Sequence, residues 1–166
     1  MKLNDEDIVI RKALPGDGKA IFKLIYELAE YEKLTHQVIG TAEQLEIDLF
    51  EPTPKCEALV AEVGGHVVSY ALFFGTYSTF RTQYGVYLED LYVSINYRGQ
   101  GIGRRMLACV AKTTIARGGG RLEWSVLDWN EPAIRFYESL GAFAQSEWTM
   151  NRLTAEALTN LARQAK

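Results

Sequence analysis

The residues best suited to chemistry in this chain form the heptapeptide Tyr-Arg-Gly-Gln-Gly-Ile-Gly at positions 97–103. Three glycines within five positions let the backbone approach a ligand closely and turn its N–H groups into one concavity. The segment follows a β-type run and opens a helix-type run, so the helix N-terminus adds partial positive charge. The loop therefore predicts an anion site, most simply for phosphate. The alternative is a flexible connector.

Two familiar phosphate loops do not match these positions. The dinucleotide-binding fingerprint Gly-x-Gly-x-x-Gly, begun at Gly99, requires glycine where the chain has Arg104. The P-loop, also begun at Gly99, requires glycine followed by lysine from the same position. The pattern that remains is Arg98-x-x-Gly101-x-Gly103.

This pattern resembles the acetyl-CoA pyrophosphate loop of the GNAT superfamily of N-acetyltransferases. A second segment resembles the same superfamily, because Asn130 precedes a short helix pattern that ends in Phe136-Tyr137, with Gly-Ala at 141–142. The resemblance implies an α/β fold in which a mixed central sheet, with a splayed parallel pair, is flanked by helices. It also implies a single N-acetyltransferase domain over residues 1–166 and acetyl-CoA as the acetyl donor.

Three further segments narrow the resemblance. The stretches Leu28–Glu32, Tyr87–Asp90 and Trp129–Pro132 are similar to the diamine (spermidine/spermine) and thialysine acetyltransferases, and the similarity covers nearly the whole chain. The reaction it implies is direct attack of a small aliphatic primary amine on acetyl-CoA in a ternary complex. Such relatives commonly pair as homodimers, so we expect a homodimer here.

The same resemblance assigns cofactor contacts to three segments. The pantetheine arm is expected to pair with 91–93 like an added strand, and the pyrophosphate to lie on the glycine loop. The implied contacts are Leu91, Tyr92, Val93, Arg98, Gly99, Gln100, Gly101, Ile102, Gly103, Arg104, Asn130, Ala133, Phe136 and Tyr137.

Two side chains are implied in catalysis. An alkylamine is almost wholly protonated at neutral pH and must lose that proton before it attacks a thioester. Glu89, in the β run before the loop, accepts the proton directly or through water, or else anchors the cationic substrate. Tyr137 is expected to protonate the departing thiolate; the alternative is a core aromatic beside Phe136.

An amine-binding wall follows from the resemblance and suits an alkylammonium chain, which aromatic faces and carboxylates attract. Its implied members are Tyr31, Glu32, Glu89, Asp90, Glu123, Ser125 and Trp129. The polyamine enzymes carry an acidic residue and a tryptophan where this chain has Ser78 and Phe80, and an acidic pair where it has Thr35-His36. We therefore expect a thialysine-like or lysine-like amine, or a short diamine, rather than spermine.

Two other functions stay open. A protein or peptide N-acetyltransferase uses the same chemistry on a different acceptor. A non-catalytic acyl-CoA-binding regulator keeps the loop at 98–103, although it does not need Tyr137.

Composition limits the partners. The formal net charge of -3 is not that of a nucleic-acid-binding protein. No apolar run is long enough to span a bilayer and no leader-like segment is visible, so we expect a cytoplasmic protein without membrane contact. Cys56 and Cys109 are expected as buried free thiols, and His36 and His66 lack ligand spacing, so no metal is expected.

Periodicity and turn residues place the elements. Strands are expected at 8–10, 56–63, 66–74, 86–93, 122–127 and 142–153, with a Gly64-Gly65 hairpin turn and a loop at 75–85. Helices are expected from the N-cap Asp17 to about Leu34, from Thr41 to Phe50, at 101–117, at 132–140 and after Thr154. The segments from 86 to 127 predict a βαβ unit with parallel strands.

Overall fold

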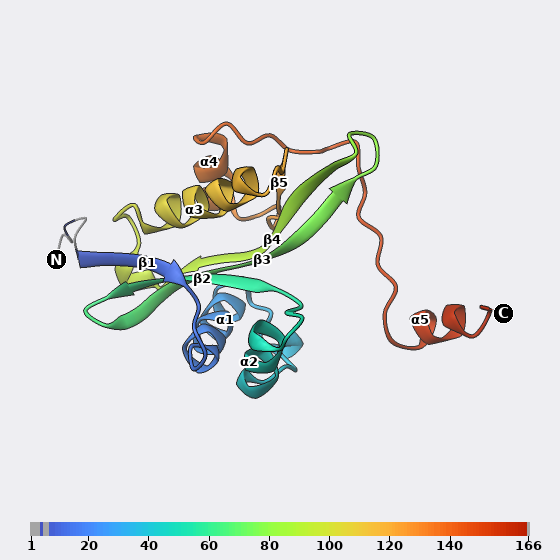
Figure 1. The fold of residues 1–166 in the computed structure, drawn as a ribbon, viewed down its shortest axis with the longest axis horizontal. Coiled ribbons are helices and arrows are strands. Elements are labelled where there is room, and N and C mark those ends of the chain that lie inside the picture. The colour runs from blue at the N-terminus through green and yellow to red at the C-terminus, as the bar shows by residue number, and fades with distance from the viewer. Residues whose placement is uncertain (1–3, 5–6, 166) are drawn as a thin grey trace. The chain divides into compact units, whose positions relative to one another are not determined.

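The computed structural model describes residues 4 and 7–165 (Figure 1). The chain forms two compact units, Met1–Ser125 and Val126–Lys166, and each is described by itself. The first unit contains the sheet and three helices, and the second contains two short helices joined by extended chain.

The sheet of the first unit has its strands in chain order, β1 to β5. Their bounds are Ile8–Lys12, Glu57–Val63, His66–Ser78, Gln83–Val93 and Leu122–Glu123. The first four pair antiparallel, whereas β4 and β5 pair parallel at Val86–Leu122 and Tyr87–Glu123. The predicted α/β fold with a mixed sheet and a βαβ unit is confirmed.

The β2–β3 hairpin matches the prediction, whereas the β3–β4 hairpin does not. Gly64 and Gly65 have φ values of 56° and 78°, which is the two-residue turn that joins β2 to β3. The predicted loop at 75–85 is wrong, because pairing continues to Ser78–Gln83 and leaves only a short turn. Gly75 makes room for the neighbouring strand: a Cβ there would lie 2.8 Å from the Tyr84 ring.

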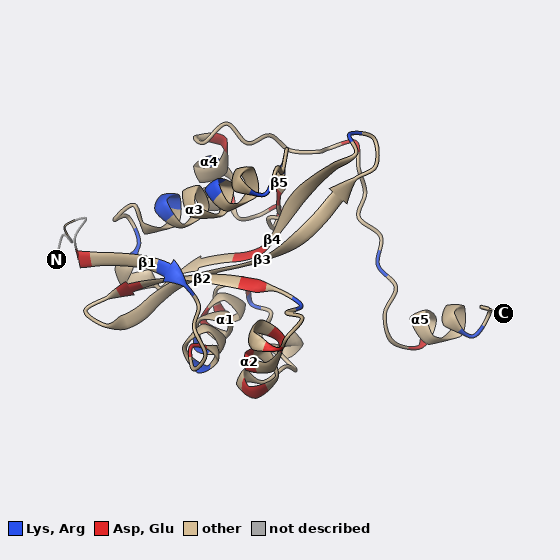
Figure 2. Cartoon of the chain, viewed as in Figure 1, with Lys and Arg blue, Asp and Glu red and all other residues tan. Residues whose placement is uncertain are grey.

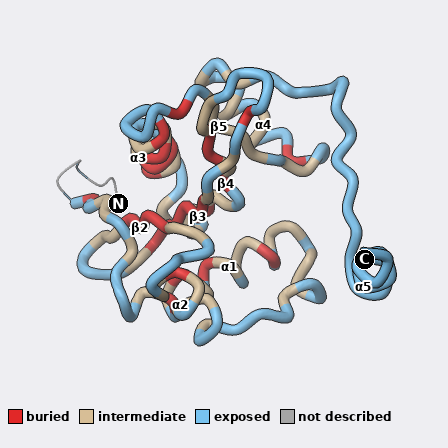
Figure 3. The backbone as a smooth tube through the Cα atoms, turned by 45° about the vertical axis from the view of Figure 1, so that its right-hand side comes forward, coloured by how far each residue is buried: buried red, intermediate tan, exposed pale blue. Residues whose placement is uncertain are grey.

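Three helices cover the sheet: α1 (Gly18–Glu32), α2 (Ala42–Phe50) and α3 (Ile102–Ala116). One face packs against α1 and α2 in a cluster formed by Ile21, Leu24, Leu49, Ala58, Val60, Tyr70, Leu72 and Tyr92. The buried face of α3, with Ile102, Met106 and Val110, covers the other side of the sheet (Figure 3). Short 3-10 turns span Thr35–Gln37 and Ile95–Tyr97.

Two predicted caps have different outcomes. Thr41 caps α2 as expected, since its hydroxyl accepts from the Gln44 N–H at 3.1 Å. Asp17 precedes α1 but makes no side-chain cap bond. Its carboxylate accepts instead from the Leu14 N–H at 2.7 Å and from Arg11 at 2.6 Å, so it braces the turn before the helix.

The second unit contains α4 (Glu131–Glu138) and α5 (Ala155–Ala162). The strand expected at 142–153 is wrong: no strand forms among these described residues, most of which are exposed (Figure 3). The strand expected at 122–127 is reduced to its first two residues. Alternation alone does not make a strand, because its N–H and C=O groups also need a ladder partner.

Candidate active site

A β-bulge in β4 positions the acidic pair Glu89–Asp90. Phe73 lies opposite Leu88 and Leu72 lies opposite Asp90, so Glu89 is the extra residue of the longer strand. Leu72 belongs to the cluster under α1 and α2, and directly opposed residues share a face. Asp90 therefore lies on that face, while Leu88 lies on the α3 face with Phe73. Without the bulge, Leu88 and Asp90 would share one side.

Asp90 is set into this face beside a buried phenol. The Tyr70 hydroxyl donates to Asp90 Oδ2 at 3.0 Å, and the Tyr70 side chain is 0% exposed. Burial raises the pKa of Asp90 to about 6, and the negative charges of Glu89 and Glu32 act in the same direction, while the hydrogen bond from Tyr70 opposes them. At neutral pH Asp90 is therefore still an anion, although its burial makes the ionised form unfavourable.

Glu32 extends the acidic region from the end of α1. Burial raises the pKa of its carboxyl group, and the helix C-terminus is itself the negative end of the helix dipole. Within the described residues, Glu32, Glu89 and Asp90 take part in no ion pair, whereas Glu57 is paired with Arg117 at 2.5 Å. Three such carboxylates around one position favour a cationic ligand.

Aromatic side chains and Arg98 border the acidic region. The Arg98 guanidinium lies 4.7 Å from the centre of the Tyr31 ring and 5.1 Å from that of Tyr92. Its Nε donates to the Val93 carbonyl oxygen at 2.9 Å. The rings of Tyr31 and Tyr92 therefore already accept a cation in this structure, which is the interaction expected for an alkylammonium substrate.

The glycine loop has the geometry that an anion site needs. Gly99 and Gly101 have φ values of 73° and 79°, with no atom within 4 Å of a Cβ placed on either. The first hydrogen bond of α3 runs from the Arg105 N–H to the Gly101 carbonyl at 3.1 Å. The N–H groups of 102–104 thus have no partner inside the helix and are available to phosphate oxygens.

Charge on the helix behind the loop agrees with this assignment. Arg104, Arg105 and Lys112 lie on α3, which carries no acidic residue, whereas α2 carries Glu43, Glu46 and Asp48 (Figure 2). The helix that begins at the glycine loop is therefore the basic one, as a polyanionic ligand requires.

The parallel pair opens beside this loop. Only Val86 and Tyr87 of β4 pair with β5, although β4 continues to Val93. Residues 88–93 therefore have no ladder partner on that side among the described residues. This open edge includes Leu91, Tyr92 and Val93, the segment predicted to pair with pantetheine.

Glu123 and Ser125 lie at the point where the pair opens. Arg121 Nε lies 2.8 Å from a carboxylate oxygen of Glu123, and the Ser125 hydroxyl is 2.7 Å from the Tyr87 hydroxyl. Both predicted substrate residues are thus held by neighbours at the end of β5. Their contact with a substrate stays a prediction.

The remaining predicted residues lie in the second unit. Asn130 is 8% exposed and caps α4, accepting from the Ala133 N–H at 3.4 Å. The rings of Phe136 and Tyr137 are 5.2 Å apart at an interplanar angle of 53°. Trp129 is 53% exposed. That these residues join the loop and Glu89 in one site stays a prediction.

Sequence reasoning missed Tyr70. In the sequence it is one more apolar position in a buried strand, and no local signal marks its hydroxyl as the partner of a residue on the next strand.

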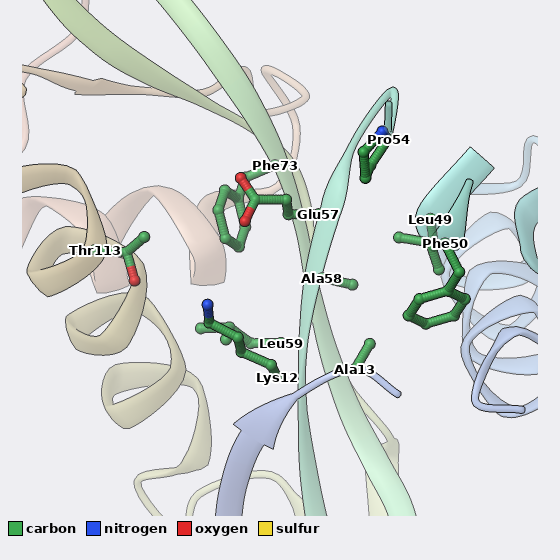
Figure 4. Close-up of a pocket in the computed structure, with 10 residues that line it drawn as sticks. All are labelled: Lys12, Ala13, Leu49, Phe50, Pro54, Glu57, Ala58, Leu59, Phe73 and Thr113. Carbon is green, nitrogen blue, oxygen red and sulfur yellow. The ribbon is translucent and has the colours of Figure 1, made fainter. Parts of the chain in front are cut away.

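A hollow elsewhere in the first unit is lined by Lys12, Ala13, Leu49, Phe50, Pro54, Glu57, Ala58, Leu59, Phe73 and Thr113, none of them a predicted site residue (Figure 4).

Other expectations concern metals, thiols and membranes. Within residues 4 and 7–165, no group of three metal-ligating side chains is found. Cys56 and Cys109 are free but half-buried rather than buried, and burial raises the pKa of the Cys56 thiol. Among the described helices, none combines the length and apolar character that a bilayer-spanning segment needs.

Comparison with known proteins shows the family and the fold. Residues 24–142 match the Acetyltransferase (GNAT) family. The chain is 42% identical to thialysine N-epsilon-acetyltransferase of Bos taurus, over 93% of this chain and 97% of that protein. It is 33% identical to L-ornithine N5-acetyltransferase of Arabidopsis thaliana, over 90% and 85% of the two chains. An integron cassette protein of V. cholerae has the same fold, with a TM-score of 0.80 at 22% identity over 95% and 99% of the chains.

The family match and the relatives show that the chain is an N-acetyltransferase, and the enzymes of this family use an acyl-CoA donor. The chain belongs to the GNAT acetyltransferase family.

Proposed function

We propose that this enzyme transfers the acetyl group of acetyl-CoA to the side-chain amine of a small amino acid of the thialysine, lysine or ornithine type, or to a short diamine. The observation that carries the proposal is the acidic and aromatic surface around the bulge, where Glu32, Glu89 and Asp90 have no ion-pair partner among the described residues. The names of the relatives at 42% and 33% identity support the same class of acceptor.

The residues that follow the bulge in the chain fit acetyl-CoA, the acetyl donor. The N–H groups of 102–104, together with Arg98 and Arg104, would hold the pyrophosphate, and the open edge at 91–93 would hold the pantetheine arm. Bound acetyl-CoA supplies the activated acetyl group. The chain's own residues have to orient the amine, accept its proton and protonate the leaving thiolate.

The two acidic residues of the bulge have different proposed roles. Glu89 is exposed on the bulge, where it can pass a proton to water, and it either accepts the proton or anchors the amine. Asp90 is an anion at neutral pH and is suited to bind the ammonium group. Tyr137 is proposed to protonate the thiolate, which requires that the second unit completes one domain with the first.

The assembly and location of the protein follow the resemblance rather than any contact in this chain. We propose a homodimer in the cytoplasm. Sedimentation of the purified protein tests the first point: a monomer at micromolar concentration contradicts it.

Acceptor specificity is tested with purified protein and acetyl-CoA, by following thiol release. The panel contains thialysine, lysine, ornithine, putrescine, spermidine, spermine and a histone-tail peptide. We expect the highest kcat/KM for one of the short amines, and a large loss in Tyr137→Phe. Turnover of the peptide alone, or a clear preference for spermine, contradicts the proposal.

A further inference from the structure

The hydrogen bond between Tyr70 and Asp90 is unusual for its surroundings. Tyr70 lies on β3 among apolar side chains such as Ile21, Leu24 and Val60, and is 0% exposed. A phenol in an apolar core needs a partner for its hydroxyl, because an unsatisfied buried polar group is costly. Among the described residues, the hydroxyl has one hydrogen-bond partner, Asp90 Oδ2, at 3.0 Å.

The two oxygens of the Asp90 carboxylate differ in their hydrogen bonding. Oδ2 is occupied by the Tyr70 hydroxyl, whereas Oδ1 accepts no hydrogen bond within the described residues. Opposition across the strands sets this geometry, because Asp90 lies opposite Leu72 and Tyr92 lies opposite Tyr70 on the same face. The phenol thus reaches diagonally from one strand to the next.

We propose that Tyr70 is a positioning residue for acetyl transfer: its buried hydroxyl holds one oxygen of Asp90, so that the other is left to accept the ammonium group of the amine substrate. This inference rests on the proposed function. The inference adds Tyr70, a core residue that contacts neither substrate nor cofactor. Tyr70 instead determines the position and the charge of the Asp90 carboxylate.

The charges around Asp90 explain why such help is needed. Burial disfavours the ionised form, and the carboxylates of Glu89 on β4 and Glu32 on α1 disfavour it further. Among the described residues, Tyr70 on β3 is the group that acts on Asp90 in the opposite direction. Arg98 is engaged with Tyr31, Tyr92 and the Val93 carbonyl. Burial raises the pKa of Tyr70 itself, so it remains a protonated donor throughout the working range.

The variant Tyr70→Phe tests this by removing only the hydroxyl from an apolar site. A hydrogen bond to an ionised group favours that form, so its loss should move the acid limb of kcat/KM for the amine to higher pH, by about one pH unit. For a group that titrates near pH 6, activity should fall about fivefold at pH 6 and hardly at all at pH 8. General damage to the fold would lower activity equally at both values.

Tyr84→Phe is the matched control. It removes a phenol hydroxyl from β4 that accepts only a long bond from Arg117, at 3.4 Å, and Tyr84 is not part of the proposed site. Its pH profile should coincide with that of the wild type. An unshifted profile in Tyr70→Phe, or an equal shift in both variants, overturns the proposal.

A second measurement separates this inference from the proposed function. The carboxyl carbon of Asp90, followed by NMR in the ligand-free protein, should titrate at higher pH in Tyr70→Phe than in the wild type. If no amine is acetylated but this shift is present, the proposed function fails and the pair stands. If Tyr70→Phe does not fold, the Tyr70 ring-carbon signals of the wild type must titrate together with Asp90, and their failure to do so overturns the pairing.

Discussion

The Arg98 guanidinium is held between the Tyr31 ring, 4.7 Å from its centre, and the Val93 carbonyl, to which Nε donates at 2.9 Å. One side chain thus connects the predicted amine-binding wall with the strand edge predicted for pantetheine. Arg98 is also the arginine of the pattern Arg98-x-x-Gly101-x-Gly103. To bind a pyrophosphate, its guanidinium would have to leave the Tyr31 ring and the Val93 carbonyl.

Arg98→Ala should weaken CoA binding by about 10- to 100-fold, because a charge-assisted hydrogen bond contributes about 1.5–3 kcal/mol. Arg98→Lys should recover part of this loss, since it keeps the charge without the planar fork. Calorimetric titration with CoA measures both. Lys23→Ala removes an exposed charge from α1 and is the control; equal affinity for Arg98→Ala and this control excludes a pyrophosphate contact.

Glu89→Gln should lower kcat/KM for the amine by about 100-fold or more, because general-base catalysis contributes about 10²- to 10⁴-fold. Steady-state kinetics separate the two roles left open for this side chain. A base loses kcat at nearly constant amine KM, whereas an anchor raises KM. Glu43→Gln, on the exposed first turn of α2, should behave as wild type. Wild-type kinetics in Glu89→Gln would remove Glu89 from the mechanism.

Gly101→Ala should impair the cofactor site through the backbone. Its φ of 79° is left-handed and no atom lies within 4 Å of the added Cβ, so the cost is conformational, about 1–2 kcal/mol. Gly16 has a φ of 101° and equally open space, which makes Gly16→Ala the matched control. Both variants should lose similar free energy of unfolding, but only Gly101→Ala should lose CoA affinity. Equal CoA affinity in the two contradicts the loop assignment.

Asp90→Asn should make the protein more stable at pH 7. The folded-state pKa is about 6, above the ordinary value of about 3.9 expected on unfolding. The unfolded chain therefore releases this proton at lower pH, and ionisation of Asp90 destabilises the fold increasingly as pH rises from about 4 through 6. Above pH 6 the penalty reaches about 2–3 kcal/mol, which asparagine avoids. Urea unfolding at several pH values checks this: the gain should vanish near pH 4, and a gain independent of pH contradicts it.

The acidic region formed by Glu32, Glu89 and Asp90 is unfavourable for folding. Asp90 and Glu32 both have raised pKa values because of burial, and neither has a cationic partner among the described residues. Elsewhere in the first unit, Arg11 holds Asp17 and Glu62, and Arg117 holds Glu57. A cationic substrate would supply the charge that the site lacks.

Several features follow from the sequence alone because they depend on neighbouring residues. Gly101 adopts a left-handed φ at the start of α3, Thr41 caps α2, and Gly64-Gly65 turns the first hairpin. Each is set by the conformational freedom or hydrogen bonding of a few successive positions. The parallel β4–β5 pair also follows, because a strand, a helix and a strand joined by short turns can close in only one favourable way.

Tertiary structure decides what depends on register between strands. The extra residue at Glu89 sends Leu88 and Asp90 to opposite faces, and only the pairing of β3 with β4 reveals it. The same pairing lengthens the hairpin past Gly75 and brings the Tyr70 hydroxyl to Asp90, 20 residues away. The alternating residues at 142–153 form no strand for the complementary reason, since a strand exists only where a second chain segment satisfies its hydrogen bonds. Local pattern thus determines which residues can do chemistry, and long-range pairing determines which of them meet.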